Sequence, residues 1–498
     1  MANGLKTRSI KGLLWSASEG IGVAALSLGS FAFLARLLEP GDFGIVALGS
    51  AFIICFNLII GHSFVDAVVQ QPQLTPEHLD TAFWSTIGAA ILLTLFCLAG
   101  AGAVATLLHE PKLAVVLPWL GTVLVVNALG AVPIAIFRRE LHFRTLAMCT
   151  LSGRATGAAA SIAMAFTGFG LWSLVAQQVI AGIVTSLVVS VAARWRPRFR
   201  FSLRYLREMG QFGFHVSTSQ VISGLGEQAL TLLIGSLFGS VVLGHFSVAW
   251  RIVQLIRSLV ATAVYQVAFS TFAKLQNDRP AMIRAFMKAT RLSCLVGFPI
   301  GIGMAVTARP AIFVLFGGKW ESSIPIFAIL ALDMVPAFFL IFVSASYRSM
   351  GRPAWALYAA LVYFVVGIGG MTALSHFGIV AVTAFWVIKS FALLPLHLVL
   401  TRKLLGIPLR HFVSAAAPPL AASAVMAACA AAILWAMRDI HYAPAQLAAA
   451  ALGGALSYVL ATRLFAPSLF QDALQTGRIM ITPGSKHSAG TDTAQNPI

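Results

Sequence analysis

The chain has 498 residues, of which 59% are hydrophobic and only 10% are charged, and its mean hydropathy is +0.88. A soluble domain carries about 25% charged residues, so a water-soluble fold is excluded and lipid must surround most of the chain. The net charge of +18 does not by itself indicate nucleic-acid binding, because the loops of membrane proteins also collect Lys and Arg.

The N-terminus superficially resembles a secretory signal peptide. Lys6, Arg8 and Lys11 precede an apolar run that continues to Leu37. This run is longer than the roughly 7–15 residues of a signal-peptide core, and no A-x-A cleavage site follows it. We therefore expect a retained first helix.

Apolar runs of membrane-spanning length recur along the chain. A spanning helix needs about 17–25 mainly apolar residues, whereas the strands of membrane barrels have about ten. The pattern therefore predicts an all-α polytopic membrane protein with about fourteen helices, at 12–36, 44–66, 82–108, 113–137, 146–167, 170–192, 213–238, 242–270, 292–316, 324–346, 354–375, 378–400, 412–436 and 444–465.

The basic residues predict the orientation of these helices. If the N-terminus is cytoplasmic, 25 of the 34 Lys and Arg lie in cytoplasmic segments and only 5 at external ends. One missed helix would invert every later loop and remove this bias. The charges therefore predict that both termini are cytoplasmic.

A weak internal repeat has an offset of about 200 residues. Gly44 corresponds to Gly244, and Pro118 in the fourth helix corresponds to Pro325 in the tenth. The repeat predicts two six-helix lobes related by a pseudo-two-fold axis along the membrane normal, as in alternating-access transporters. The expected divisions are a first lobe (1–192), a cytoplasmic linker (193–212), a second lobe (213–402), two further helices (403–470) and a disordered tail (471–498).

Soluble-enzyme motifs are missing from the sequence. It contains no P-loop, GxSxG, HExxH or GxGxxG motif, so we expect no catalytic residues and no ATP binding by a P-loop. The five cysteines form neither a CxxC pair nor a Cys/His spacing typical of metal sites. We expect no metal and no cofactor.

Several residues inside the predicted helices indicate local structure. Gly153-x-x-x-Gly157 and Gly297-x-x-x-Gly301 predict close helix packing. Prolines within helices predict kinks or breaks, at Pro133, Pro299, Pro336, Pro395 and Pro418-Pro419. Trp84, Trp172 and Trp320 are typical of interfacial anchors.

The arginine-rich run from 194 to 207 predicts a linker helix on anionic lipid, with nucleic-acid binding as the weaker alternative.

Charged residues within apolar helices are the candidate functional residues. Each costs at least about 2.5–3.5 kcal/mol on insertion scales, so it usually faces a bundle interior or a wet cavity. We expect Arg154, Arg251, Arg257 and Lys389 to bind an anionic group such as a pyrophosphate in a cavity between the lobes.

The acidic residues within the helices have several possible roles. Glu19, Glu227 and Asp333 could take protons, pair with the basic residues or bind sugar hydroxyls. The alternative for the whole charged set is a group of structural ion pairs between helices. Arg251 and Arg257 are six residues apart on one helix, so they cannot point at one spot.

Several short motifs resemble a known family. They are Lys11-Gly12-x-x-Trp15-Ser16, Ala35-Arg36-Leu37-Leu38-x-Pro40-x-Asp42-Phe43-Gly44, Ala67-Val68-Val69-Gln70, Thr81-Ala82-Phe83-Trp84, Arg139-x-Leu141-x-Phe143-Arg144, Gly170-Leu171-Trp172-Ser173-Leu174-Val175-Ala176-Gln177 and Gly317-Gly318-Lys319-Trp320. Over about residues 10–400 the chain resembles the Wzx-type polysaccharide flippases, nearest their WzxC-like branch, of the multidrug/oligosaccharidyl-lipid/polysaccharide exporter superfamily.

The resemblance implies a function in polysaccharide or lipopolysaccharide biosynthesis. It implies a two-lobe flippase in the bacterial inner membrane that translocates an undecaprenyl-pyrophosphate-linked oligosaccharide and works beside glycosyltransferases and a polysaccharide polymerase. Two alternatives stay open. A cation-coupled exporter of small molecules or drugs would favour an acidic cavity, whereas the bases within the helices equal or outnumber the acids. A membrane polysaccharide polymerase or ligase would favour a large external loop, which the sequence lacks.

Overall fold

A computed structural model describes residues 2–70, 74–272, 279–343, 353–440 and 442–465, with 467, 470 and 471. Side chains are described for fewer residues, and those of residues 1–19 lie outside the description. Regular structure within these ranges is helical throughout, without strands. The all-α prediction is therefore confirmed, whereas the predicted disordered tail beyond 471 lies outside the described residues.

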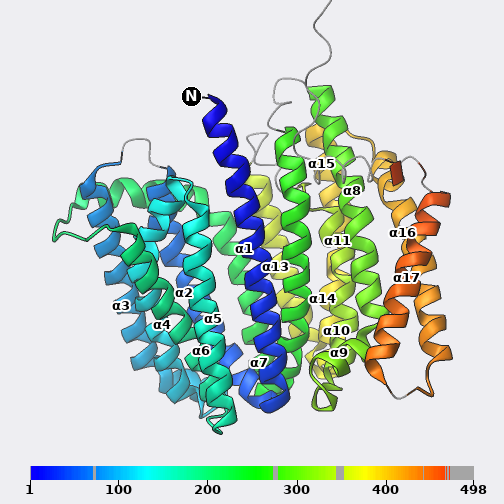
Figure 1. The fold of residues 1–498 in the computed structure, drawn as a ribbon, viewed down its shortest axis with the longest axis horizontal. Helices are drawn as coiled ribbons and strands as arrows, with labels where there is room; N and C mark the ends of the chain where they lie inside the picture. Colours follow the sequence, from blue (N-terminus) through cyan, green and yellow to red (C-terminus); the bar gives the residue numbers. More distant parts are fainter. Residues whose placement is uncertain are drawn as a thin grey trace, which may run out of the picture.

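The helices stand side by side as one bundle (Figure 1). The first part of the chain forms α1 (Ala2–Leu37), α2 (Pro40–Gln70), α3 (Pro76–Leu107), α4 (Leu113–Arg139), α5 (Phe143–Phe166), α6 (Leu171–Ala193) and α7 (Leu203–Phe272). The second part forms α8 (Arg279–Val306), α9 (Ala308–Leu315), η1 (Gly318–Trp320), α10 (Ser323–Leu332), α11 (Met334–Phe339), α13 (Pro353–Leu374), η2 (Ser375–Phe377), α14 (Ile379–Ala392), α15 (Leu394–Leu405), α16 (Leu409–Ala436) and α17 (Ala443–Phe465).

The lengths of these helices make the chain a multi-pass membrane protein. Eleven segments of the described chain are long and apolar enough to span a membrane. One of them, Gly224–Thr262, contains two helices, because α7 bends at Gly239. Two shorter or more polar helical segments, α5 and Ser323–Phe339, fall below the length or hydropathy of a span. Together these helices correspond to the fourteen that the sequence predicts.

Gly239 marks the point where α7 turns back on itself. Its φ of 78° and ψ of 176° are backbone angles that only glycine adopts at low cost. The next residue, Ser240, donates its backbone N–H to Oε1 of Glu110 at 2.7 Å. This bond satisfies a donor that a bend in a helix would otherwise leave open.

Three predicted helices are interrupted, which corrects the predictions over 292–316, 324–346 and 378–400. The breaks fall at Thr307, Asp333 and Leu393. A proline follows each break within three residues, and a proline cannot donate the backbone hydrogen bond that would continue the helix. By contrast, the chain stays helical through Pro133 and Pro299.

The same pattern of neighbouring helices occurs twice along the chain. In the first set, α1 packs on α5, α2 and α3 pack on α4, and α6 packs on α4 and α5. In the second set, α7 packs on α13, α7 and α8 pack on α10, and α14 packs on α10 and α13. This repetition supports the two predicted sets of six helices. Their boundaries at 192, 212 and 402 stay a prediction.

Two glycines mark the closest contact between the two sets. A Cβ on Gly44 would lie 1.7 Å from the carbonyl oxygen of Ser240, and a Cβ on Gly244 would lie 1.8 Å from that of Pro40. The four residues form two pairs with a common offset of 200, so the contact is reciprocal. This is the geometry of a pseudo-two-fold axis between α2 and the second half of α7.

Further contacts join the two sets at the same end of the bundle. Trp320 is fully buried and donates its indole N–H to the carbonyl oxygen of Ala35 at 2.8 Å. Lys319 pairs with Glu39 at 2.8 Å, and Arg36 donates to the carbonyl oxygens of Val314 and Leu315. We name this end, defined by residues 36–40 and 314–320, the gate end. The expectation that Trp320 is an interfacial anchor is wrong, because it closes this contact.

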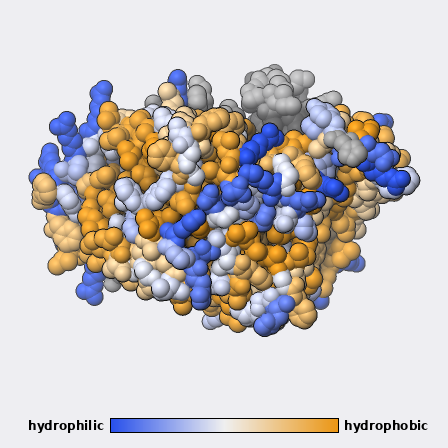
Figure 2. Space-filling model, turned by 90° about the horizontal axis from the view of Figure 1, so that it is seen from below, coloured by the Kyte–Doolittle hydropathy of each residue, from blue (hydrophilic) through white to orange (hydrophobic). Residues whose placement is uncertain are grey.

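The gate end can be viewed directly in Figure 2. Apolar side chains cover most of the surface, and hydrophilic side chains form an uneven band across it (Figure 2). The chain's N-terminus lies at the opposite end of the bundle (Figure 1).

The segment between α6 and α7 differs from its prediction. Residues 194–202 are not helical, and α7 begins at Leu203 within the expected linker. The segment is bound to α3, because Asp80 accepts the backbone N–H of Arg198 at 3.0 Å and Trp84 donates to the carbonyl oxygen of Arg198 at 2.8 Å. Phe199 stacks on Trp84 at 4.8 Å between ring centroids. These contacts replace the predicted linker helix.

The small-residue motifs bring helices into close contact within the chain. A Cβ on Gly153 would lie 2.6 Å from the carbonyl oxygen of Ala181, and a Cβ on Gly157 would lie 2.6 Å from that of Gln177. The prediction of close packing is therefore confirmed for α5 and α6. This packing brings Arg154, one residue after Gly153, beside the face of α6 that carries Gln177.

Candidate functional site

A cavity of about 830 Å³ lies between the two helix sets, which is within the usual size of small-molecule sites. Helices α1, α2, α6 and both halves of α7 form its wall, and α5 contributes one residue. Its polar and charged lining comprises Ser27, Ser30, Ser50, Arg154, Gln177, Gln178, Glu227, Gln228, Thr231, Ser247, Arg251, Gln254, Arg257 and Ser258. The predicted cavity between the lobes therefore exists, and it collects residues from six predicted helices.

Arg154 and Arg251 are the two uncompensated cations of the cavity. Both side chains are exposed in its lining, and neither pairs with a carboxylate in the described part of the chain. The guanidinium carbon of Arg251 lies 4.7 Å from the ring centroid of Phe31, which supports the cation without neutralising it. These two arginines give the cavity a positive potential.

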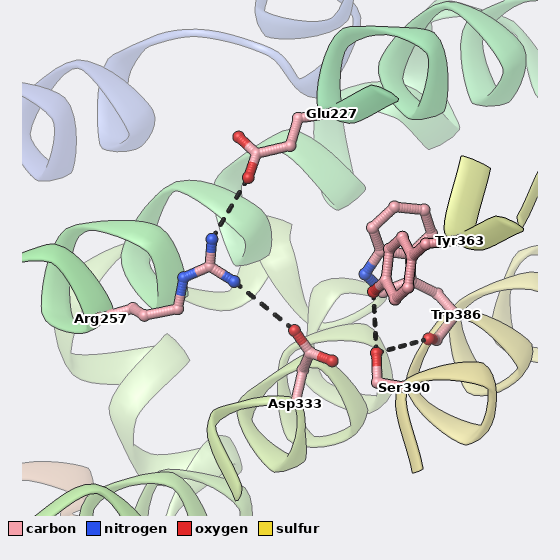
Figure 3. Close-up of polar contacts among 6 residues, drawn as sticks. All are labelled: Glu227, Arg257, Asp333, Tyr363, Trp386 and Ser390. Atoms are coloured by element: carbon pink, nitrogen blue, oxygen red, sulfur yellow. Dashed lines mark hydrogen bonds and ion pairs between the residues drawn. The ribbon is translucent and has the colours of Figure 1, made fainter. Parts of the chain in front are cut away.

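Arg257 is paired, unlike the other two cavity arginines. Its Nη2 lies 3.2 Å from Oε1 of Glu227, and its Nη1 lies 3.6 Å from Oδ2 of Asp333 (Figure 3). The two acids come from the first half of α7 and from the break between α10 and α11. Arg257, Glu227 and Asp333 therefore form ion pairs between helices, and Arg257 and Glu227 also line the cavity.

Lys389 does not line the cavity, which corrects its predicted place beside the arginines. Only 2% of Lys389 is exposed. Its Nζ lies 3.4 Å from the ring centroid of Tyr363 and 3.5 Å from that of Trp386. No hydrogen-bond acceptor reaches it within the described residues. The Tyr363 hydroxyl is hydrogen-bonded to the hydroxyl of Ser390 at 2.8 Å, which fixes this ring (Figure 3).

The seventh predicted residue, Glu19, lies in α1, but its side chain is outside the described residues. Four glutamines of the cavity wall were missed by the sequence analysis: Gln177, Gln178, Gln228 and Gln254. These glutamines could have been recognised in the sequence, because an amide inside an apolar helix is also costly to bury without a partner. The site residues predicted from the sequence are all residues with a formal charge.

Aromatic rings line the cavity beside its polar residues. Trp250 lines the cavity and stacks on Phe246 with an interplanar angle of 19° and a centroid distance of 5.8 Å. The cavity lining therefore contains two guanidinium groups without a carboxylate partner in the described chain, four amides, several hydroxyl groups and an indole ring. This combination suits a large ligand that has both an anionic part and a neutral hydroxylated part.

Comparison with known proteins identifies the family. A family model described as "Polysaccharide biosynthesis protein" matches residues 33–325. The succinoglycan biosynthesis transport protein ExoT of Rhizobium meliloti (strain 1021) is 29% identical over 319 residues, which are 64% of this chain and 65% of that relative. The lipopolysaccharide biosynthesis protein WzxC of Escherichia coli (strain K12) is 23% identical over 362 residues, which are 72% of this chain and 70% of that relative.

Solved structures share the fold. An inward closed structure of the lipid II flippase MurJ superposes with a TM-score of 0.74 over 93% of this chain and 100% of that chain, at 15% identity. An inward-facing multidrug resistance transporter of the MATE family gives a TM-score of 0.58 over 79% of this chain and 94% of that chain, at 17% identity. The family match covers more than half of the chain, and the fold agrees with it. The chain therefore belongs to the polysaccharide biosynthesis protein family.

Proposed function

We propose that this protein is a flippase that translocates undecaprenyl-pyrophosphate-linked oligosaccharides across the bacterial inner membrane. One observation carries the proposal: Arg154 and Arg251 enter the cavity between the helix sets without a carboxylate partner in the described chain. A pyrophosphate supplies the missing negative charge, and the forked donors of arginine match its oxygens. The names of the relatives, which concern succinoglycan transport and lipopolysaccharide biosynthesis, support a role in moving a polysaccharide precursor.

The closed gate end supports a transport cycle of alternating access. With both termini cytoplasmic, the gate end faces away from the cytoplasm and is sealed by Trp320, Lys319 and Arg36. The head group of the cargo enters the cavity from the cytoplasmic side, while its lipid tail stays in the bilayer. Opening the gate end and closing the opposite end then releases the head group outside.

The proposed step is a movement of cargo in which no covalent bond forms or breaks. The protein is therefore a transporter rather than an enzyme. Its cargo requires glycosyltransferases that assemble the oligosaccharide on the cytoplasmic side. A polysaccharide polymerase that consumes the translocated unit completes the set of partners. These roles follow from the chemistry of the cargo and from the family.

Replacement of Arg251 by Ala tests the proposal. A hydrogen bond to a charged group contributes about 1.5–3 kcal/mol, so we expect cargo affinity to fall about 10- to 100-fold. The measurement is polymer export in a strain that depends on this gene, at equal amounts of membrane-inserted protein. Arg251→Lys should restore part of the export, because the charge returns without the fork.

Arg438→Ala is the matched control. Arg438 lies 5.2 Å from the ring centroid of Trp435, so it too is an arginine beside an aromatic ring, but it lies outside the cavity lining. Export should not change in this variant. Full export by Arg251→Ala, in protein that reaches the membrane normally, would contradict the proposed pyrophosphate site.

A further inference from the structure

The cavity contains more polar groups than a pyrophosphate needs. Gln177 and Gln178 occupy consecutive positions on α6, Gln228 lies on the first half of α7, and Gln254 lies on the second half. These amides are neutral, so they add no positive charge to attract a pyrophosphate anion, and their carbonyl oxygens cannot hydrogen-bond to it. Their presence in an apolar bundle therefore requires another explanation.

Gln177 and Gln178 are already oriented by the protein. The Nε2 atom of Gln177 donates to the hydroxyl oxygen of Ser30 at 3.1 Å, and that of Gln178 donates to the hydroxyl oxygen of Ser50 at 2.9 Å. Each amide keeps a carbonyl oxygen with two lone pairs and a second N–H. One serine bond per amide therefore fixes its position on the cavity wall and leaves further hydrogen-bonding groups for a ligand.

Gln228 and Gln254 make no side-chain hydrogen bond within the described part of the chain, although both line the cavity. An amide carries two donors and one acceptor with two lone pairs, and water or a ligand must supply the partners. A sugar hydroxyl both donates and accepts, so a pyranose ring can satisfy several amides at once. A phosphate only accepts, so it leaves the amide oxygens unmatched.

The indole of Trp250 also lines the cavity, where an aromatic ring can contact the apolar side of a sugar. The face of an aromatic ring carries partial negative charge, and the C–H groups on one side of a pyranose carry partial positive charge. Trp250 is held by stacking on Phe246 and by an edge contact with Trp386, whose ring centroid lies 6.1 Å away. The platform is therefore fixed in the cavity wall.

We propose that Gln177, Gln178, Gln228 and Gln254, together with Trp250, form a subsite for the neutral sugar next to the pyrophosphate. The inference rests on the proposed function, because it assigns a second part of the same cargo to the same cavity. The subsite makes sugar recognition separate from charge recognition. A site built from amides rejects a ligand that lacks the matching hydroxyls, since its own polar groups then lose partners.

The test compares two probes on purified protein in nanodiscs. The first probe is undecaprenyl pyrophosphate without sugar, and the second is undecaprenyl pyrophosphate that carries one neutral hexose, glucose or galactose. The wild-type protein should bind one glycosylated probe at least about tenfold more tightly than the bare lipid. The double variant Q228M/Q254M should lose this advantage and bind the bare lipid normally, because neither amide supports the fold by a hydrogen bond in the described chain.

The controls separate the subsite from the pyrophosphate site. Arg251→Ala should weaken both probes by the same factor, and Gln446→Met, in the first turn of α17, should weaken neither. Equal loss of both probes in Q228M/Q254M, or a retained preference for sugar, overturns the subsite. If the wild-type protein does not distinguish the probes, the subsite is refuted while the pyrophosphate site stands. If Arg251→Ala binds both probes normally, the proposed function fails.

Discussion

Arg251 and Lys389 show that a cationic residue within an apolar helix can have two different surroundings. Both are cations within apolar helices, and both were predicted to bind the cargo. Arg251 is exposed in the cavity, whereas Lys389 is 2% exposed between two aromatic rings. The insertion cost of a charge is similar for both, but only the cavity residue can exchange its aromatic neighbour for a ligand.

Replacement of Lys389 by Met tests this distinction. A buried ammonium group without a hydrogen bond loses several kcal/mol of hydration, while its cation–π contacts return about 2 kcal/mol. Met fills a similar volume without a charge, so we expect the free energy of unfolding to rise by about 1 kcal/mol or more. Thermal denaturation in detergent measures this change, and polymer export should stay within about twofold of the wild type.

Lys403→Met is the matched control, because Lys403 is exposed at the end of α15. Its stability should change by less than about 0.5 kcal/mol. Loss of export in Lys389→Met, in protein that folds normally, would return Lys389 to the cargo site.

At the scale of helices, the reciprocal glycines decide how closely α2 and α7 can approach. A methyl group on Gly44 or Gly244 would overlap a backbone carbonyl of the partner helix, which has no rotamer to change. The helices would have to separate at the gate end. The two positions are equivalent by the repeat, so they should respond alike.

We expect Gly44→Ala and Gly244→Ala each to destabilise the closed gate end by about 1–3 kcal/mol, the usual cost of overpacking. Gly100→Ala is the control, because nothing lies within 4 Å of its added Cβ. This control should instead gain up to about 1 kcal/mol from the helix propensity of Ala. The measurement is the thermal midpoint of each variant. Unequal effects at the two glycines would contradict the pseudo-symmetric contact.

For the whole molecule, the arrangement predicts that the gate end must open during transport. Lys319 and Glu39 belong to different helix sets, and their side chains meet at 2.8 Å. A double variant, E39C/K319C, places two thiols at this contact. Cross-linking with a short bifunctional maleimide should reduce polymer export to the background level, whereas either single cysteine variant should be unaffected by the reagent.

The result depends on movement rather than on the loss of one ion pair. Surface ion pairs contribute about 0–1 kcal/mol, so the double variant without the reagent should export normally. Full export after complete cross-linking would show that cargo does not cross through an opening at this end.

The sequence by itself determined that the chain is a multi-pass membrane protein, the approximate positions of most of its helices and the family. These features depend on local quantities, namely the length of apolar runs, the distribution of basic residues and short motifs, and none requires knowledge of a distant contact. The kinks or breaks predicted at Pro336 and Pro395 are confirmed by the breaks at Asp333 and Leu393. Pro310 could have predicted the break at Thr307 in the same way, since the effect of a proline on backbone hydrogen bonding is also local.

Only the tertiary structure decided which of the charged residues share a cavity. The rotation of a helix about its axis and the partner across the bundle depend on packing between segments far apart in the chain. Packing placed Arg154 and Arg251 in one cavity, paired Arg257 with two acids and enclosed Lys389 between aromatic rings. Because a buried charge is costly, its neighbours must stabilise it. The sequence does not specify whether a ligand, an acid or an aromatic ring does so.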